Sequence, residues 1–196
     1  MFRRVRLSTS NLFVELIVIG AGVLIWLALL VFTALGFPSL EFGESLLFVS
    51  AIPLLATTYV AGIIWDRVVD YVFEKIWVDR WRVALFPNKK DYYEARRTIL
   101  TKSERLSDLL EYGRSRMRIC RSWTLNSILI GFSLNIFLYK KFLENDNFEM
   151  LIITATSISV AFSIGAWFAW SSLVKTEYRK IKEQSVYLQE ISASST

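Results

Sequence analysis

The chain has 196 residues, of which 54% are hydrophobic, and its mean hydropathy is +0.39. Four long apolar runs in a chain of this size exclude an ordinary soluble domain and predict an integral membrane protein. The net charge of +5 follows from the orientation rule for membrane proteins, so it does not indicate nucleic acid binding. The sequence has no histidine and no Walker loop, nucleophile elbow or metal-ligand spacing, so we expect neither an enzyme nor a cofactor.

The first apolar run, Leu12–Leu35, follows a basic N-terminus. At about 1.5 Å per residue it can cross a hydrocarbon layer of about 30 Å with some tilt. It is longer than the core of a signal peptide, so we expect a retained first span. Glu15 lies one turn inside its basic end. It is either an interfacial carboxylate near arginines or a charge that faces a pore or a partner helix.

A short loop without lysine or arginine, Phe37–Glu44, leads to the second apolar run, Leu46–Trp65. Pro53 within this run removes one helical hydrogen bond, so we expect a kink that is either static or a hinge. Thr57 and Thr58 follow the kink, and we expect their hydroxyls to repair the freed backbone groups.

A charged island, residues 66–122, separates the two pairs of apolar runs and holds 14 Lys/Arg and 9 Asp/Glu. The helix of the second span is expected to continue into it, because helical periodicity persists past the apolar run. Asp66, Asp70 and Glu74 recur every four residues on one face of this extension. In a symmetric oligomer they would form rings around a cation vestibule; the alternative is ion pairing with nearby Arg and Lys.

A further island helix is predicted from Asp91, as its N-terminal cap, to Tyr112, with Gly113 as its end. Four arginines then precede the third span: Arg114, Arg116, Arg118 and Arg121. Near an anionic leaflet each contributes about 1 kcal/mol, so they would anchor the helix end at the interface. The alternative is a seat for a phosphate-bearing ligand or nucleic acid, which requires aromatic residues that converge on the arginines. Cys120 is expected to be an ordinary structural thiol.

The third span is predicted at about Trp123–Phe142, and one of its faces is polar. That face carries Thr124, Ser127, Gly131 and Asn135. The stripe either lines water or bonds to neighbouring helices, and Ser127 and Asn135 are its candidate pore residues. A short acidic loop, Glu144–Glu149, follows.

The fourth apolar run, Met150–Val174, has small residues at steps of four, which favour close helix packing. These are Ser157, Ala161, Gly165 and Ala169. An apolar stripe continues through Val174, Tyr178, Ile181 and Leu188. It predicts a C-terminal helix that packs on the island or on a neighbouring subunit, with disorder from residue 191 onward.

The distribution of basic residues predicts the topology. Of the 23 Lys/Arg, all but Lys140 and Lys141 lie in the N-terminus, the island or the tail. Both termini and the island are therefore expected in the cytoplasm. The predicted outer loops lack cysteine and glycosylation acceptors, which suits a bacterial inner membrane.

These observations predict an all-α integral membrane protein with four transmembrane helices and cytoplasmic helical extensions. Its parts are a first transmembrane hairpin (1–65), the charged segment (66–122), a second transmembrane hairpin (123–174) and a cytoplasmic C-terminal helix and tail (175–196).

The layout of residues 12–174 resembles that of connexin- and innexin-type large-pore channels, with four spans, both ends inside and the main soluble loop between spans two and three. The outer loops here are short and cysteine-free, so docking between cells is not implied. Small bacterial membrane effectors of phage defence are also similar in size and span count. These resemblances imply an oligomeric pore.

Two functional hypotheses follow from the sequence. The first is a homo-oligomeric pore or channel. In one form of this hypothesis it is an effector that permeabilises the inner membrane when its cytoplasmic segment receives a signal. The second is a non-conducting adaptor that recruits a soluble protein through residues 66–122 and the C-terminal helix. A transporter ranks third, because no paired broken helices are visible. The expected partners are the lipid bilayer, further copies of the chain and a soluble protein.

Overall fold

The computed structural model describes the backbone of residues 2–36 and 44–194 and the side chains of residues 12–36, 50–77 and 81–190. The expected loop at residues 37–43, the basic side chains of the N-terminus and residues 195–196 lie outside the described residues. All regular structure in the described ranges is helical. The elements are α1 (Phe2–Leu35), α2 (Glu44–Phe73), a π-helical turn η1 (Glu74–Val78), α3 (Asp79–Leu85), α4 (Lys89–Lys102), α5 (Glu104–Phe142) and α6 (Phe148–Ser194).

Four helices in the described ranges are long and apolar enough to cross a membrane: α1, α2, α5 and α6. This confirms the all-helical class and the four helices of spanning length. α5 has 39 residues and α6 has 47, so they are about 58 Å and about 70 Å long. Each is about twice as long as the hydrocarbon layer is thick, so an apolar segment continues directly into a charged one.

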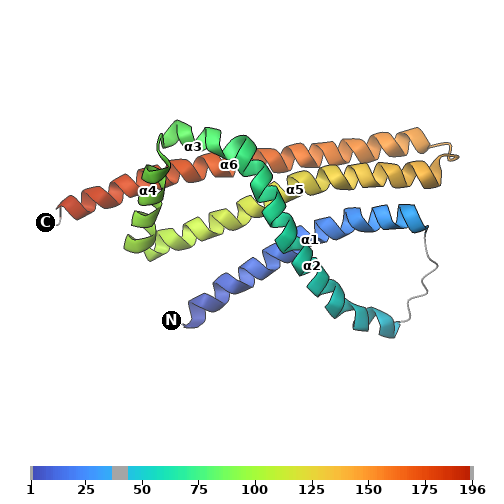
Figure 1. The fold of residues 1–196 in the computed structure, drawn as a ribbon, viewed down its shortest axis with the longest axis horizontal. Coiled ribbons are helices and arrows are strands. Elements are labelled where there is room, and N and C mark those ends of the chain that lie inside the picture. The colour runs from blue at the N-terminus through green and yellow to red at the C-terminus, as the bar shows by residue number, and fades with distance from the viewer. Residues whose placement is uncertain (1, 37–43, 195–196) are drawn as a thin grey trace.

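The long helices lie along the molecule, and α2 crosses them at an angle (Figure 1). α5 and α6 form an antiparallel hairpin, and α1 runs beside α5. Both chain ends lie at the end of the molecule that holds α4 (Figure 1). We call residues 66–122 and 175–190 the charged body, and residues 12–65 and 123–174 the spanning part.

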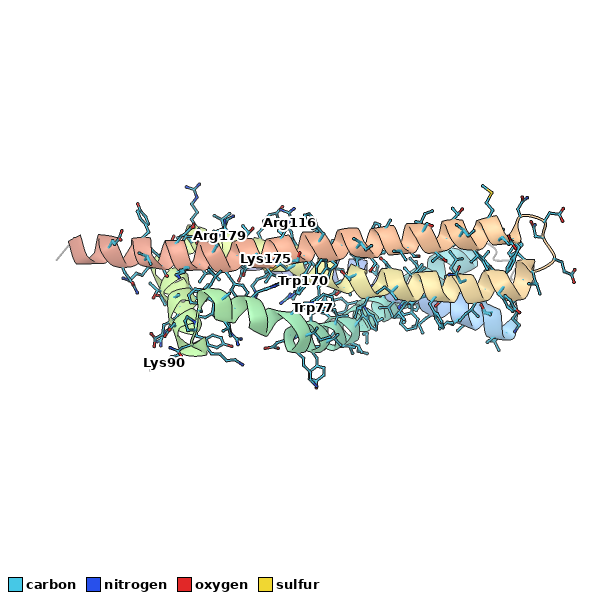
Figure 2. All side chains as sticks on the ribbon, turned by 90° about the horizontal axis from the view of Figure 1, so that it is seen from above. Trp77, Lys90, Arg116, Trp170, Lys175 and Arg179 are labelled. Atoms are coloured by element: carbon cyan, nitrogen blue, oxygen red, sulfur yellow. The ribbon has the colours of Figure 1, made fainter. Side chains whose placement is uncertain are left out.

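The main apolar core lies where the spanning part meets the charged body. Its fully or nearly buried members are Val69, Phe73, Phe86, Ala95, Ile99, Leu110, Trp170, Val174, Tyr178 and Ile181. Aromatic rings pack against one another in this core: the ring centroids of Phe73 and Trp170 are 4.5 Å apart, in an edge-to-face arrangement. Trp77 lies against Trp170, with a centroid distance of 6.2 Å (Figure 2). The predicted packing of the C-terminal helix on the island is thereby confirmed, and α6 continues to Ser194, past the expected start of disorder.

Two predicted helix boundaries in the island are wrong. α4 begins at Lys89, and its cap position is Asn88, whose Nδ2 donates to Asp91 Oδ2 at 3.2 Å. The next break comes at Ser103, where the Leu106 amide donates to the Ser103 hydroxyl at 3.4 Å. Gly113 lies inside α5, because a tertiary contact outweighs the cost of about 1 kcal/mol for glycine in a helix.

The closest helix contact in the spanning part is the crossing of α1 and α2. A Cβ on Gly20 would lie 1.8 Å from the Thr58 carbonyl oxygen, and one on Gly62 would lie 2.0 Å from that of Leu16. Only glycine allows the two backbones to approach so closely. At Gly165, by contrast, a Cβ would meet nothing within 4 Å.

The small-residue stripe of α6 therefore faces outward within a single chain. Ser157, Ala161 and Gly165 are exposed, and Ala169 is half-buried. Close packing by this stripe stays a prediction, and the contact it predicts is one with another chain.

α2 passes through Pro53 without interruption and bends along its length (Figure 1). The Thr57 hydroxyl donates to the Pro53 carbonyl at 2.8 Å, and that of Thr58 donates to the Leu54 carbonyl at 2.7 Å. Proline leaves the carbonyl four residues earlier, at Val49, without its amide donor. The predicted repair by these threonines is therefore wrong, because they bond to other carbonyls. A hinge at Pro53 stays a prediction.

Candidate functional site

A charged cleft lies at the boundary between the spanning part and the charged body. Its volume is about 280 Å³, and α2, α4, α5 and α6 all contribute to its walls. Six arginines line it: Arg67, Arg82, Arg96, Arg114, Arg118 and Arg121. Four carboxylates line it as well: Asp66, Asp70, Glu74 and Glu177. The excess of two positive charges makes this cleft attractive to anions.

One wall of the cleft is an ion-pair bridge from α5 to α2. Arg121 Nη2 donates to Asp66 Oδ1 at 2.9 Å, and Nη1 contacts Asp70 Oδ1. Asp66 and Asp70 are one helical turn apart, so a single guanidinium fork can bond to both. Asp66 is 2% exposed, and its carboxylate also lies 3.6 Å from Arg67. Within one chain, this geometry favours the ion-pair interpretation of Asp66 and Asp70.

Glu74 belongs to the π-helical turn and remains exposed at the edge of the cleft. It is thus the member of the predicted acidic face that is most open to solvent. Glu15 is buried in α1, where its Oε2 lies 3.8 Å from Arg118 Nη1 of α5. This carboxylate therefore lies near an arginine, as the first interpretation expects, and that arginine belongs to another helix, as the second expects.

The arginine cluster divides between two faces of α5. Arg114, Arg118 and Arg121 follow helical spacing and line the cleft. Arg116 lies off that face and is exposed, with its guanidinium 5.7 Å from the centre of the Tyr112 ring. The cluster thus provides three cleft residues and one residue outside the cleft.

The other walls bring in residues that the sequence reasoning missed. Tyr92, Tyr93 and Arg96 come from α4, and Glu177 comes from α6. Glu177 lies beyond the apolar run, and burial raises its pKa to about 7 against the opposing pull of Arg114, Arg96 and Lys180. No local sequence signal could find these residues, because two helices far apart in the sequence, α4 and α6, carry them.

Gly113 has its role at this same site. A Cβ there would lie 3.3 Å from Glu177 Oε2, so the missing side chain lets the carboxylate approach α5 closely. Cys120 of the same helix is a half-buried free thiol outside the cleft lining.

The polar stripe of the third span packs against α6. Ser163 Oγ donates to the Thr124 carbonyl at 3.0 Å, and Asn135 Nδ2 donates to Thr156 Oγ1 at 2.8 Å. A Cβ on Gly131 would lie 2.6 Å from Ser159, so the helices approach closely there. The Ser127 hydroxyl is buried and donates within its own helix, to the Trp123 carbonyl at 2.6 Å. Within one chain, these contacts favour helix contact over a water-lined stripe.

A different polar line runs between α1 and α5, and the sequence reasoning missed it. Asn126 Nδ2 donates to the Ile19 carbonyl at 3.1 Å. Buried polar atoms along this line have no hydrogen-bond partner within the described ranges: Glu15 Oε2, Ser122 Oγ, Asn126 Oδ1 and Ser133 Oγ. Ser122, Asn126 and Ser133 share one face of α5 by their spacing. We call these four residues the α1–α5 seam.

No family model, curated protein or solved structure matches this chain. Its function is therefore inferred from its own residues and their geometry.

Proposed function

We propose that this protein is a homo-oligomeric pore or channel of the bacterial inner membrane, with its charged body in the cytoplasm. The α1–α5 seam carries the proposal. Polar atoms without partners cost several kcal/mol each in hydrocarbon, roughly the penalty for an unmade hydrogen bond. Ser122 and Asn126 are 0% exposed and Ser133 is 1% exposed, so the seam is closed in this conformation. If α1 and α5 separate, water or a passing ion would satisfy the free oxygens of these three residues. A hydrated path through the membrane explains why such atoms are retained.

The outer surface of the spanning part supports assembly from several copies. Every side chain from Ser50 to Thr57 is exposed in α2, and so is most of α6 between Met150 and Phe168. Gly165 lies on that exposed face of α6 with open space around it. A second copy can approach closely there, as the small-residue stripe predicts.

The orientation is tested by cysteine labelling in a Cys120→Ser background. A cysteine at Asn147 lies between α5 and α6 and is expected to react with a membrane-impermeant reagent from the periplasm. A cysteine at Ser107 lies in the charged body and is expected to be protected until the membrane is opened. Labelling of Ser107→Cys in intact spheroplasts would reverse the topology. A probe at Ser39 falls outside the described residues.

Conduction is tested with the purified full-length protein in planar bilayers. Asn126→Leu removes the polar side chain at the centre of the seam and is expected to lower conductance strongly, and Ser133→Ala more weakly. Ser172→Ala is the matched control, because this exposed hydroxyl of α6 lies outside the seam. Equal conductance in all three variants would reject the seam as the path. If the parent protein carries no measurable current at any voltage, the pore proposal is rejected.

Ion preference is tested at the acidic face of α2. Glu74 is the exposed carboxylate, so Glu74→Gln is expected to reduce cation preference while assembly is unchanged. The double variant Asp66→Asn, Asp70→Asn removes the partners of Arg121 and is expected to affect stability as well. If both proteins select ions as the parent does, the acidic face is structural.

The adaptor is the second candidate, and the packed charged body favours it. Helices α4, α5 and α6 share one apolar core there, which gives a soluble partner a defined surface. If the protein is an adaptor, the full-length protein is expected to bind a specific cytoplasmic protein in a pull-down and to show no conductance. If the protein is instead a permeabilising effector, a signal that binds to the charged body is expected to open the pore and raise the conductance.

A further inference from the structure

Two arginines of the cleft have no ion pair among the side chains that the structure describes. Arg121 is engaged by Asp66 and Asp70, and Arg118 lies near Glu15. Arg96 and Arg114 make no ion pair within 4.0 Å among the described side chains. Arg96 is half-buried and Arg114 is exposed. Their like charges repel each other across the cleft, because water screens charges less in a partly enclosed space than in bulk.

We propose that this cleft binds an anionic phosphate group through Arg96, Arg114 and Arg118. Guanidinium groups are planar, permanently charged donors that bind phosphate with paired hydrogen bonds. Arg96 approaches from α4, whereas Arg114 and Arg118 lie one turn apart on α5. A bound phosphate would offset the mutual repulsion of the three side chains.

Aromatic residues converge on the same space. Tyr92 and Tyr93 line the cleft beside Arg96, and Trp170 closes another side. The hydroxyl of Tyr92 makes no hydrogen bond to the described residues, so it is a free donor for a phosphate oxygen. The ligand interpretation of the arginine cluster expects aromatic residues at the arginines, and Tyr92 and Tyr93 line the same cleft.

Size and position restrict the ligand. A cavity of about 280 Å³ is at the lower end of small-molecule sites, so it suits a headgroup or a small phosphate compound. The cleft lies where the apolar runs end, so it can receive a phosphate from a lipid of the adjoining leaflet or from the cytoplasm. Both sources present the same chemistry to the arginines.

Glu177 is the natural competitor for these arginines. Its carboxylate lies near Arg114 and Arg96, yet no ion pair within 4.0 Å forms with either. Burial raises its pKa to about 7, so at neutral pH it compensates them only in part. Neutralising Glu177 is therefore expected to strengthen binding, while neutralising Arg114 or Arg96 weakens it.

The experiment uses the full-length protein in nanodiscs and does not depend on conduction. In the soluble arm, phosphatidylcholine nanodiscs are titrated with inorganic pyrophosphate by calorimetry. In the lipid arm, retention of phosphatidylglycerol is measured by native mass spectrometry from nanodiscs that mix it with phosphatidylcholine. Arg116→Gln is the matched control, because this arginine is on the same helix but outside the cleft.

In whichever arm shows binding, Arg114→Gln is expected to lower affinity about tenfold, as for the loss of a charged hydrogen bond. Glu177→Gln is expected to raise it, and Arg116→Gln to leave it unchanged. Binding confined to the first arm assigns a soluble ligand, and binding confined to the second assigns a lipid headgroup. No binding in either arm overturns the proposal, and so does an equal loss in Arg114→Gln and Arg116→Gln.

Discussion

The apolar core of this chain is centred on the charged body, whereas the spanning part leaves most of its large apolar side chains exposed. Phe73, Ile99 and Ile181 are fully buried among α2, α4 and α6. In the spanning part a few apolar side chains such as Ile19 are buried, and the closest contacts between helices involve glycines and hydroxyl groups, as at the crossing of Gly20 with Gly62.

The difference follows from the solvent that each region is expected to meet. In water, burial of apolar area contributes about 25 cal/mol per Å², so the charged body needs a closed core. Lipid tails are as apolar as leucine, so burial of apolar groups gives little between spans. Close backbone approach and hydrogen bonds replace it there. The two regions must therefore respond differently to the same kind of substitution.

The largest effect is expected from truncation of a core ring. Phe73→Ala should lower the free energy of unfolding by about 3–5 kcal/mol, because Phe73 is 0% exposed and packs on Trp170. Phe168→Ala removes the same atoms from a side chain that is 68% exposed, and it should cost almost nothing. Equilibrium unfolding in mixed micelles measures both. Equal losses would show that the face of Phe168 is covered by another chain.

The next effect concerns the bridge between the two regions. Arg121→Gln leaves Asp66 buried with Arg67 as its remaining charged neighbour, and it should cost about 3 kcal/mol. Asp66→Asn in the same protein should recover part of that loss, because it removes the uncompensated charge. A double-mutant cycle measures the coupling. A coupling below about 1 kcal/mol would make the bridge equivalent to a surface ion pair.

A smaller effect is expected where the spans cross. Gly62→Ala places a Cβ against the Leu16 carbonyl and should cost about 2 kcal/mol through forced separation of α1 and α2. Gly165→Ala meets open space within one chain, so it should not lower the melting temperature, but it should weaken assembly if the proposed contact between copies lies on this face. Thermal melting and oligomer size in detergent are the measurements. Loss of assembly in Gly165→Ala would place a contact between copies at that stripe.

The last effect is a pH dependence in the charged body. The pKa of Glu177 is about 7 in the folded protein and 4.5 as its ordinary value, so between these pH values the folded state holds a proton that the unfolded state releases. Stability must therefore fall as pH rises from about 4.5 to about 7 and then level off. Glu177→Gln should remove this component from the measured profile. A profile identical to that of the parent would contradict the raised pKa.

Much of the spanning part could be predicted from the sequence, because run length and hydropathy alone identify a helix that can cross a membrane. The continuation of α2 and the packing of Tyr178 and Ile181 were also visible as helical stripes. The cleft was not, because Arg96, Arg114 and Glu177 come from three helices whose contacts depend on the fold. Gly113 misled the prediction for the same reason, since its partner lies on α6.

The unbroken length of α6 has a mechanical consequence. Its 47 residues form a rod of about 70 Å, with the turn to α5 at one end and with Glu177 and Tyr178 about two-thirds of the way along it. α5 is a second rod, and α2 contributes Asp66 and Asp70 to the cleft just before the π-helical turn Glu74–Val78, where helices bend readily. Two walls of the cleft are thus parts of long unbroken helices. A widening of the cleft that moves α6 away from α5 is therefore expected to change the tilt between these two helices in the spanning part as well.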